Sequence, residues 1–183
     1  MSALTSLNWA TVRSQYDLRK NVRSQLSALR QKGKTNAFVE LLLGISNPAG
    51  NYSAAEHGLG PRILVENSNA AKRVCQLSDY FLALKTGHEV PGLIRNAALR
   101  FLQIGVGSEI SCMVNPSFCW VANTRTIWTH LVIKHADDFT KAAEELKLYR
   151  EADASSEMTY AMWATIHAEL AATMTRVAEE GTN

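Results

Sequence analysis

The sequence predicts an all-α protein, built either as a single globular helical domain of about seven helices or as two small lobes. Apolar residues recur at spacings of three and four along most of the chain, which is the repeat of an amphipathic helix. Apolar residue types make up 46% and charged types 20% of the 183 residues, which is the balance of a globular chain with a buried core. No apolar run approaches the roughly 18 residues that a membrane span requires.

A first helix is expected from Asn8 to Lys32. Asn8 is a suitable N-cap, because its side-chain oxygen can accept a hydrogen bond from a free backbone N–H group, and Gly33 is a suitable stop. One apolar stripe follows its second half, formed by Leu18, Val22, Leu26 and Leu29. A short second helix is expected over 36–43, with an almost wholly apolar sequence that predicts burial, and Gly44 would end it.

The middle of the chain predicts a loop followed by two helices. The segment 46–61 is rich in Asn, Pro and Gly, which are typical of turns, so a loop is expected there. A third helix is expected over 69–86, since apolar residues repeat at three, four and three. Pro91 suits the first turn of a fourth helix, expected over 91–104 and ended by the glycines at 105 and 107.

The last third of the chain is expected to be helical as well. Over 108–123 the pattern favours a short helix that starts near Pro116, with a strand as the alternative. The segment 124–151 predicts one long helix, or two helices broken near Asp137 and Asp138. A final helix is expected over 155–180, where Met, Ile, Leu and Val recur at spacings near four.

The formal net charge of +2 conceals an uneven distribution along the chain. Residues 1–100 carry 13 basic and 6 acidic side chains, whereas 101–183 carry 6 and 11. The most basic stretch is the N-terminal end, so we expect a basic N-terminal helix or arm over 1–34 and a helical body over 35–183. Such a split suggests a polyanionic partner, or contact between the basic half of one copy and the acidic half of another.

Cations and aromatic residues share one face of the expected first helix. At spacings of four and three, the residues on this face are Trp9, Arg13, Tyr16, Lys20, Arg23, Ser27, Arg30 and Lys34. Cationic groups one turn apart suit phosphates, and aromatic rings between them suit stacking on bases. Lys34 belongs to this face only if the helix continues past Gly33. Alternatively, the two aromatic residues are core or interface anchors and the charges are a solvated face.

A second basic set is a weaker candidate for phosphate contacts. It consists of Arg62, Lys72, Arg73, Arg95 and Arg100. Lys72 and Arg73 lie in the first turn of the expected third helix, where the helix dipole disfavours positive charge and an anion would relieve the conflict. Ordinary surface charge is the alternative interpretation.

No motif in the sequence indicates catalysis, a metal site or a cofactor. The chain contains no H-E-x-x-H and no G-x-S-x-G, and the spacing of His130 and His135 is poor for two ligands on one helix. The three cysteines form no C-x-x-C pair, so free thiols are expected, with a bridge between Cys112 and Cys119 left open. The N-terminus lacks the apolar run of a signal peptide.

Together these features favour a non-enzymatic protein that binds and coats single-stranded nucleic acid, with RNA as the expected polymer and the choice between RNA and DNA left open, and that self-associates. The class of protein that we expect is a nucleoprotein or a helical-virus coat protein. We expect it in the cytoplasm or in a virion, not secreted, and without a membrane partner. Two alternatives remain open at this point. One is a helical adaptor or regulator that binds protein through its basic first helix, and the other is a small helical enzyme whose groups converge only in space.

Overall fold

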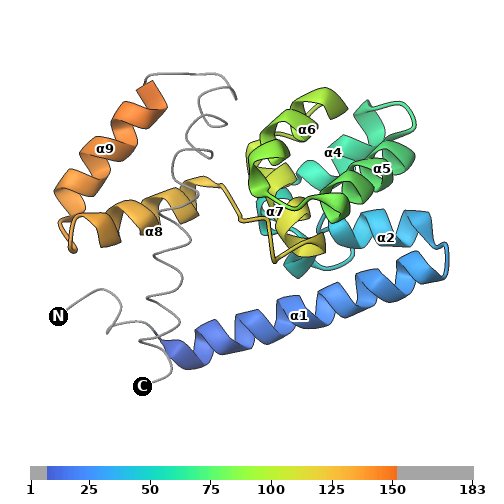
Figure 1. Ribbon diagram of the computed structural model, residues 1–183, viewed down its shortest axis with the longest axis horizontal. Helices are drawn as coiled ribbons and strands as arrows, with labels where there is room; N and C mark the ends of the chain where they lie inside the picture. The colour runs from blue at the N-terminus through green and yellow to red at the C-terminus, as the bar shows by residue number, and fades with distance from the viewer. Residues whose placement is uncertain (1–7, 152–183) are drawn as a thin grey trace. The chain divides into compact units, whose positions relative to one another are not determined.

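The computed structural model describes residues 8–151, apart from the side chains of Trp9 and of residues 148–151. Nine α-helices and two short 3-10 helices occupy this part of the chain, and no strand occurs within it (Figure 1). The prediction of an all-α protein is therefore confirmed. The final helix expected over 155–180 lies outside the described residues.

The chain divides into two compact units, which are described separately. One unit is Gln15–Asn123, and the described residues of the other are 8–14 and 124–151. The boundary falls inside the first helix, so it differs from the expected division into 1–34 and 35–183. That residues 1–34 act as an arm stays a prediction.

The first two helices begin and end close to the expected residues. In α1 (Trp9–Gln31), Asn8 is the N-cap, and its Oδ1 accepts a hydrogen bond of 3.1 Å from the backbone N–H three residues later. Gly33 adopts a left-handed φ of +63°, which ends the helix before Lys34, so Lys34 does not continue the cationic face of α1. α2 (Thr35–Leu42) follows. It buries Phe38, Val39, Leu41 and Leu42.

The segment 46–61 is mostly helical, and the prediction of a loop over its whole length is wrong. It holds the 3-10 helix η2 (Pro48–Gly50), α3 (Tyr52–Glu56) and the start of α4 (Leu59–Glu66). Each of these helices is too short to show a periodic apolar pattern, and their Asn, Pro and Gly residues are as common at helix caps as in turns. The side chains of Asn47 and Asn51 cap η2 and α3.

The third expected helix is present, and the fourth is shorter than predicted. α5 (Ala70–Ala83) is followed by the 3-10 helix η3 (Gly87–Glu89) and by α6 (Val90–Ala97). α6 ends seven residues before the expected stop because Ala98 adopts a left-handed φ of +46°. A separate helix, α7 (Ile104–Val114), begins where the stop was expected.

The glycines at 105 and 107 lie inside α7 and do not end a helix as predicted, and Gly107 serves packing. A Cβ atom at Gly107 would lie 2.5 Å from Cδ1 of Ile94, so the absence of a side chain allows α6 to approach α7 closely. After α7 the chain is irregular over 115–123, and neither the expected helix near Pro116 nor a strand forms there. Asn115 fixes this segment, since its amide donates to the carbonyls of two residues at the end of α5.

The core of Gln15–Asn123 is apolar and draws on most of the helices of this unit. Its largest fully buried apolar side chains are Val22, Val39, Leu42, Leu43, Ile63, Phe81, Ile94, Ile110 and Met113. None of the described helices is both long and apolar enough to cross a membrane.

The described part of the second unit is a helical hairpin. α8 (Thr124–Lys134) and α9 (Phe139–Glu151) are separated by left-handed residues at Ala136 and Asp137, which confirms the prediction of two helices broken at this point. Asp138 caps α9, and the hydrogen bond that it accepts from a backbone N–H lowers its pKa. The hairpin packs around Ile127, Leu131, Val132 and Ala142.

Gly50 and Gly92 allow a matched test of the packing within the unit Gln15–Asn123. A Cβ atom at Gly50 would lie 1.7 Å from the carbonyl oxygen of Leu41, whereas one at Gly92 would meet nothing within 4 Å. We expect Gly50→Ala to lower the free energy of unfolding by about 3 kcal/mol. Gly92→Ala, inside α6, should raise it by about 0.5–1 kcal/mol. Urea titrations followed by circular dichroism measure both changes, and equal stabilities for the two variants would contradict the packing described.

Candidate nucleic-acid interface

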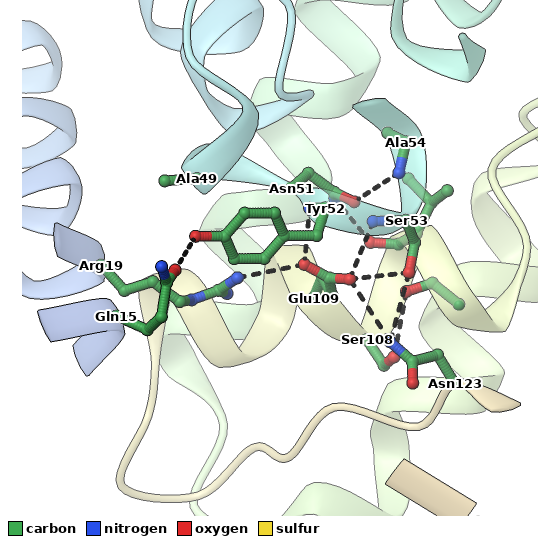
Figure 2. Close-up of polar contacts among 12 residues, drawn as sticks. Gln15, Arg19, Ala49, Asn51, Tyr52, Ser53, Ala54, Ser108, Glu109 and Asn123 are labelled. Carbon is green, nitrogen blue, oxygen red and sulfur yellow. Dashed lines mark hydrogen bonds and ion pairs between the residues drawn. The ribbon is translucent and has the colours of Figure 1, made fainter. Parts of the chain in front are cut away.

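A buried carboxylate joins α7 to α3 and α1 (Figure 2). Glu109 on α7 is 2% exposed, and both of its oxygens accept hydrogen bonds. Oε2 accepts from the backbone N–H of Tyr52 at 2.9 Å and from Nη1 of Arg19 at 3.1 Å. Oε1 accepts from the backbone N–H and the hydroxyl of Ser53, at 3.0 and 2.6 Å. Glu109 therefore satisfies the free N–H groups at the start of α3 and pairs with a cation of α1.

The same region holds α1 against α3 by a second contact one helical turn away. The guanidinium group of Arg19 lies 5.4 Å from the centre of the Tyr52 ring. The hydroxyl of Tyr52 donates to Oε1 of Gln15 at 2.7 Å. Figure 2 shows both α1 side chains pointing toward Tyr52 and Glu109. These contacts fix the rotation of α1 about its own axis.

Three arginines of α1 contact other residues of the unit Gln15–Asn123. Besides Arg19, Arg23 donates from Nε to the carbonyl oxygen of Met113 at 3.0 Å, and Arg30 forms an ion pair with Asp79 on α5. The buried Val22 and Leu26 lie on the same side of the helix. The face of α1 that docks on Gln15–Asn123 therefore differs from the predicted apolar stripe and includes part of the predicted cationic face. Arg23 and Arg30 face the unit, whereas Leu18, expected to dock, is 40% exposed.

The rest of the predicted cationic face of α1 is exposed. Lys20 and Ser27 are exposed, and Tyr16 is 65% exposed, so the alternative of Tyr16 as a core residue is wrong. Base stacking and interface anchoring both remain open for Tyr16. Arg13 is also exposed, in the part of α1 that belongs to the other unit. The side chain of Trp9 lies outside the described residues.

From the second predicted set, Arg62 and Arg100 come together around an aromatic ring. The guanidinium carbon of Arg62, on α4, lies 3.9 Å from the centre of the Phe101 ring, and that of Arg100 lies 5.5 Å from it. Each carboxylate oxygen of Glu66 forms an ion pair with one arginine, at 3.7 Å for Arg62 and 3.2 Å for Arg100. Both arginines stay accessible, at 53% and 68% exposed. We call these four residues the Phe101 cluster.

A buried amide holds the backbone of the Phe101 cluster. Asn67 accepts a hydrogen bond from the backbone N–H of Arg100 at 2.8 Å and donates to the carbonyl oxygens of Arg100 and Ile63 at 3.2 and 2.9 Å. Phe101 has a left-handed φ of +66°, a conformation that is strained for an aromatic residue. Strain of this kind persists only where the surroundings impose it, and it concentrates at functional sites.

The other three cations of this set belong to α5 and α6. Arg73 donates from Nη2 to the carbonyl oxygens of Ala97 and Ala98, at 2.6 and 3.2 Å, and so satisfies the C-terminal end of α6. Lys72 is exposed in the first turn of α5, and Arg95 is exposed in the last turn of α6.

The described cysteines form no disulfide, and one described histidine pairs with a carboxylate. All three cysteines are free, and burial raises the pKa of the Cys119 thiol to about 11. Nε2 of His135 lies 2.6 Å from a carboxylate oxygen of Glu145 within the α8–α9 hairpin. No group of three His, Cys, Asp or Glu side chains in the described part of the chain could hold a metal ion.

The sequence interpretation missed Arg19 and Glu109, although a signal for one of them exists. Glu109 is the single charged residue in the otherwise apolar and small-residue sequence of α7. A lone carboxylate in such a helix indicates a buried, paired charge, because an unpaired one would be too costly to bury. Its partner lies 90 residues away in the sequence, which no local pattern reveals.

Glu109→Gln tests the anchoring of α1. The amide places an NH₂ group against donors in a buried site and leaves the half-buried Arg19 without its counter-charge, so we expect a loss of about 3 kcal/mol in the free energy of unfolding. Asp79→Asn is the control, since it removes the same charge from the exposed pair with Arg30 and should cost less than about 1 kcal/mol. Urea titration measures both variants. Equal losses would show that Glu109 does not anchor the helix.

The raised pKa of Cys119 predicts a loss of stability at alkaline pH. The folded state holds the thiol proton more tightly than the unfolded state, where the pKa is near its ordinary value of 9.0. This contribution is complete below pH 9 and is lost as the pH rises toward 11, by roughly 2 kcal/mol. The free energy of unfolding should fall more steeply over this range in the wild type than in Cys119→Ala. Parallel pH profiles would exclude the thiol as the cause.

Comparison of the chain with protein-family models, with curated proteins and with solved structures gave no match. The function is therefore inferred from the contacts and charges of the chain's own residues.

Proposed function

We propose that this protein is a non-enzymatic protein that binds and coats single-stranded nucleic acid, with RNA as the expected polymer, and that self-associates. Its closest functional kind would be a nucleoprotein or a helical-virus coat protein, acting in the cytoplasm or in a virion. The observation that carries the proposal is the Phe101 cluster, where two exposed guanidinium groups lie against one aromatic ring.

The Phe101 cluster has the chemistry of a phosphate site. A guanidinium group carries five N–H donors in a planar fork that matches the oxygens of a phosphate. Glu66 forms ion pairs with Nε of Arg62 and with Nη1 of Arg100, which leaves other N–H groups of each arginine for a ligand. The two arginines and one carboxylate carry a net positive charge, and the ring beneath them holds both cations in place.

Exposed residues of α1 and α5 provide further cations and an aromatic ring. Tyr16 and Lys20 lie one helical turn apart on the undocked face of α1, so a ring and a cation are both presented to solvent. Lys72 is exposed at the start of α5. Arg23 and Arg30 face this unit, and we assign them to the docking of α1 first and to phosphate contacts second.

Self-association would place the basic half of one copy against the acidic half of another. The acidic side chains of the α8–α9 hairpin partly serve the hairpin itself, since Glu145 binds Lys134 and His135 and Asp138 binds Lys141. Glu144 on α9 is exposed and is the kind of residue that a neighbouring copy's cation would contact. A coat protein needs both poles, one for the strand and one for its neighbour.

Salt dependence of binding tests the proposal. On a single strand, the logarithm of the binding constant should fall linearly with the logarithm of salt concentration, with a slope of about −0.7 for each phosphate contact. Arg100→Gln should weaken binding and make the slope shallower by about 0.7, because one contact is lost. Filter binding of labelled single-stranded RNA, and of DNA with the same base sequence, measures affinity and slope.

Lys141→Gln is the matched control, since it removes one exposed charge from α9 and should change neither quantity. Absence of binding at low salt, or a flat salt dependence, contradicts the proposal. Binding of an acidic protein without binding of RNA would favour the adaptor alternative.

A further inference from the structure

A groove between α5 and α6 is a candidate ligand site that is separate from the exposed cations discussed above. Its volume is about 440 Å³, and both helices belong to the unit Gln15–Asn123. α5 contributes one face to the groove, because its lining residues at 73, 76, 77 and 80 are spaced three or four apart. The principal lining side chains are Arg73, Gln76, Leu77, Tyr80, Leu93 and Asn96.

The lining of this groove combines an apolar floor with amide groups and an aromatic ring. Leu77 is 2% exposed and Leu93 is half-buried, whereas Tyr80 is 60% exposed. The side chains of Gln76, Tyr80 and Asn96 make no hydrogen bond with any part of the chain that the structure describes. Amides at the rim of an apolar pocket supply the paired donor and acceptor that a nucleobase edge requires, and the ring supplies a stacking surface.

Arg73 is already oriented at the end of this groove. Nη2 is held by the carbonyl oxygens of Ala97 and Ala98, which fixes the plane of the guanidinium group. Nε and Nη1 have no partner among the described residues, so these donors remain for a ligand. A donor group that is fixed before binding loses little entropy when the ligand arrives.

The groove also lies next to the Phe101 cluster along the chain. Ala98 lines the groove, and Arg100 follows two residues later, which corresponds to at most about 7 Å of extended backbone. A strand whose phosphate contacts Arg100 therefore has a base within reach of the groove.

We propose that one base of the bound strand enters the groove between α5 and α6, stacks on Tyr80 and pairs its edge with Gln76 and Asn96. Arg73 donates to an acceptor atom of the same nucleotide. This inference rests on the proposed function and deepens it, because it names a subsite that contacts the base, whereas the Phe101 cluster contacts phosphate.

Tyr80→Ala separates base contact from phosphate contact. Loss of one stacked base should weaken binding of a short fluorescent single-stranded RNA by about 5- to 150-fold, measured by anisotropy. The salt slope should stay unchanged, because no phosphate charge loses its partner. Leu82→Ala is the control on the same helix, since Leu82 is 41% exposed but does not line the groove. It should bind like the wild type.

Gln76→Ala and Asn96→Ala test the recognition of the base edge. Each should change the ratio of affinities for oligo-A and oligo-U without changing the salt slope. Photocrosslinking of the wild type with RNA that contains 5-iodouridine provides a readout that needs no variant. The crosslink should map to residues 74–85, the tryptic peptide that contains Tyr80.

The outcomes separate this inference from the proposed function. If the wild type binds RNA with a steep salt slope but Tyr80→Ala binds equally well, or crosslinks map only elsewhere, the groove assignment is overturned and the proposed function stands. If the wild type does not bind RNA at low salt, both are overturned. If Tyr80→Ala does not fold, the crosslink in the wild type decides.

Discussion

The carboxylate of Glu109 is the interaction on which the arrangement of Gln15–Asn123 depends. A charge that is 2% exposed is stable only if its oxygens are satisfied, and here two backbone N–H groups, one hydroxyl and one guanidinium group do so. The donors come from α3 and α1, so the same group starts a short helix and sets the rotation of a long one. That rotation decides which α1 cations face the unit and which face solvent.

The positive charge of the first helix consequently has two roles. Arg19, Arg23 and Arg30 bind acidic or carbonyl oxygens of this unit, whereas Lys20 remains on the outer face with Tyr16. A count of charges along the chain treats these residues alike and so overstates the basic surface that a partner meets. The arrangement that we propose for phosphate contact lies elsewhere, where Arg62 and Arg100 share one ring and one carboxylate.

The parts of this fold that a local pattern determines were predictable. The apolar repeat and the end signals Asn8 and Gly33 place α1, and the same repeat places α5. An almost wholly apolar segment before Gly44 places α2, and the break before α9 was one of two alternatives for 124–151. Segment 46–61 was not predictable, because its helices are too short for a repeat and begin with residues common in turns. Gly107 was misinterpreted because its role depends on Ile94 of a neighbouring helix. For the same reason Arg62 and Arg100 were identified singly, without the ring and carboxylate that bring them together.

The central claim, that this protein coats RNA by combining a basic surface with contact between copies, is tested most directly by the state in which it is purified. Gel filtration of protein prepared at low salt without nuclease, with the absorbance spectrum recorded across the peak, reports assembly and bound nucleic acid together. The account predicts particles far larger than the 20.2 kDa chain, with the spectrum of a nucleoprotein and with both properties lost after ribonuclease treatment. A peak at the mass of one chain, with the spectrum of protein alone, would contradict it.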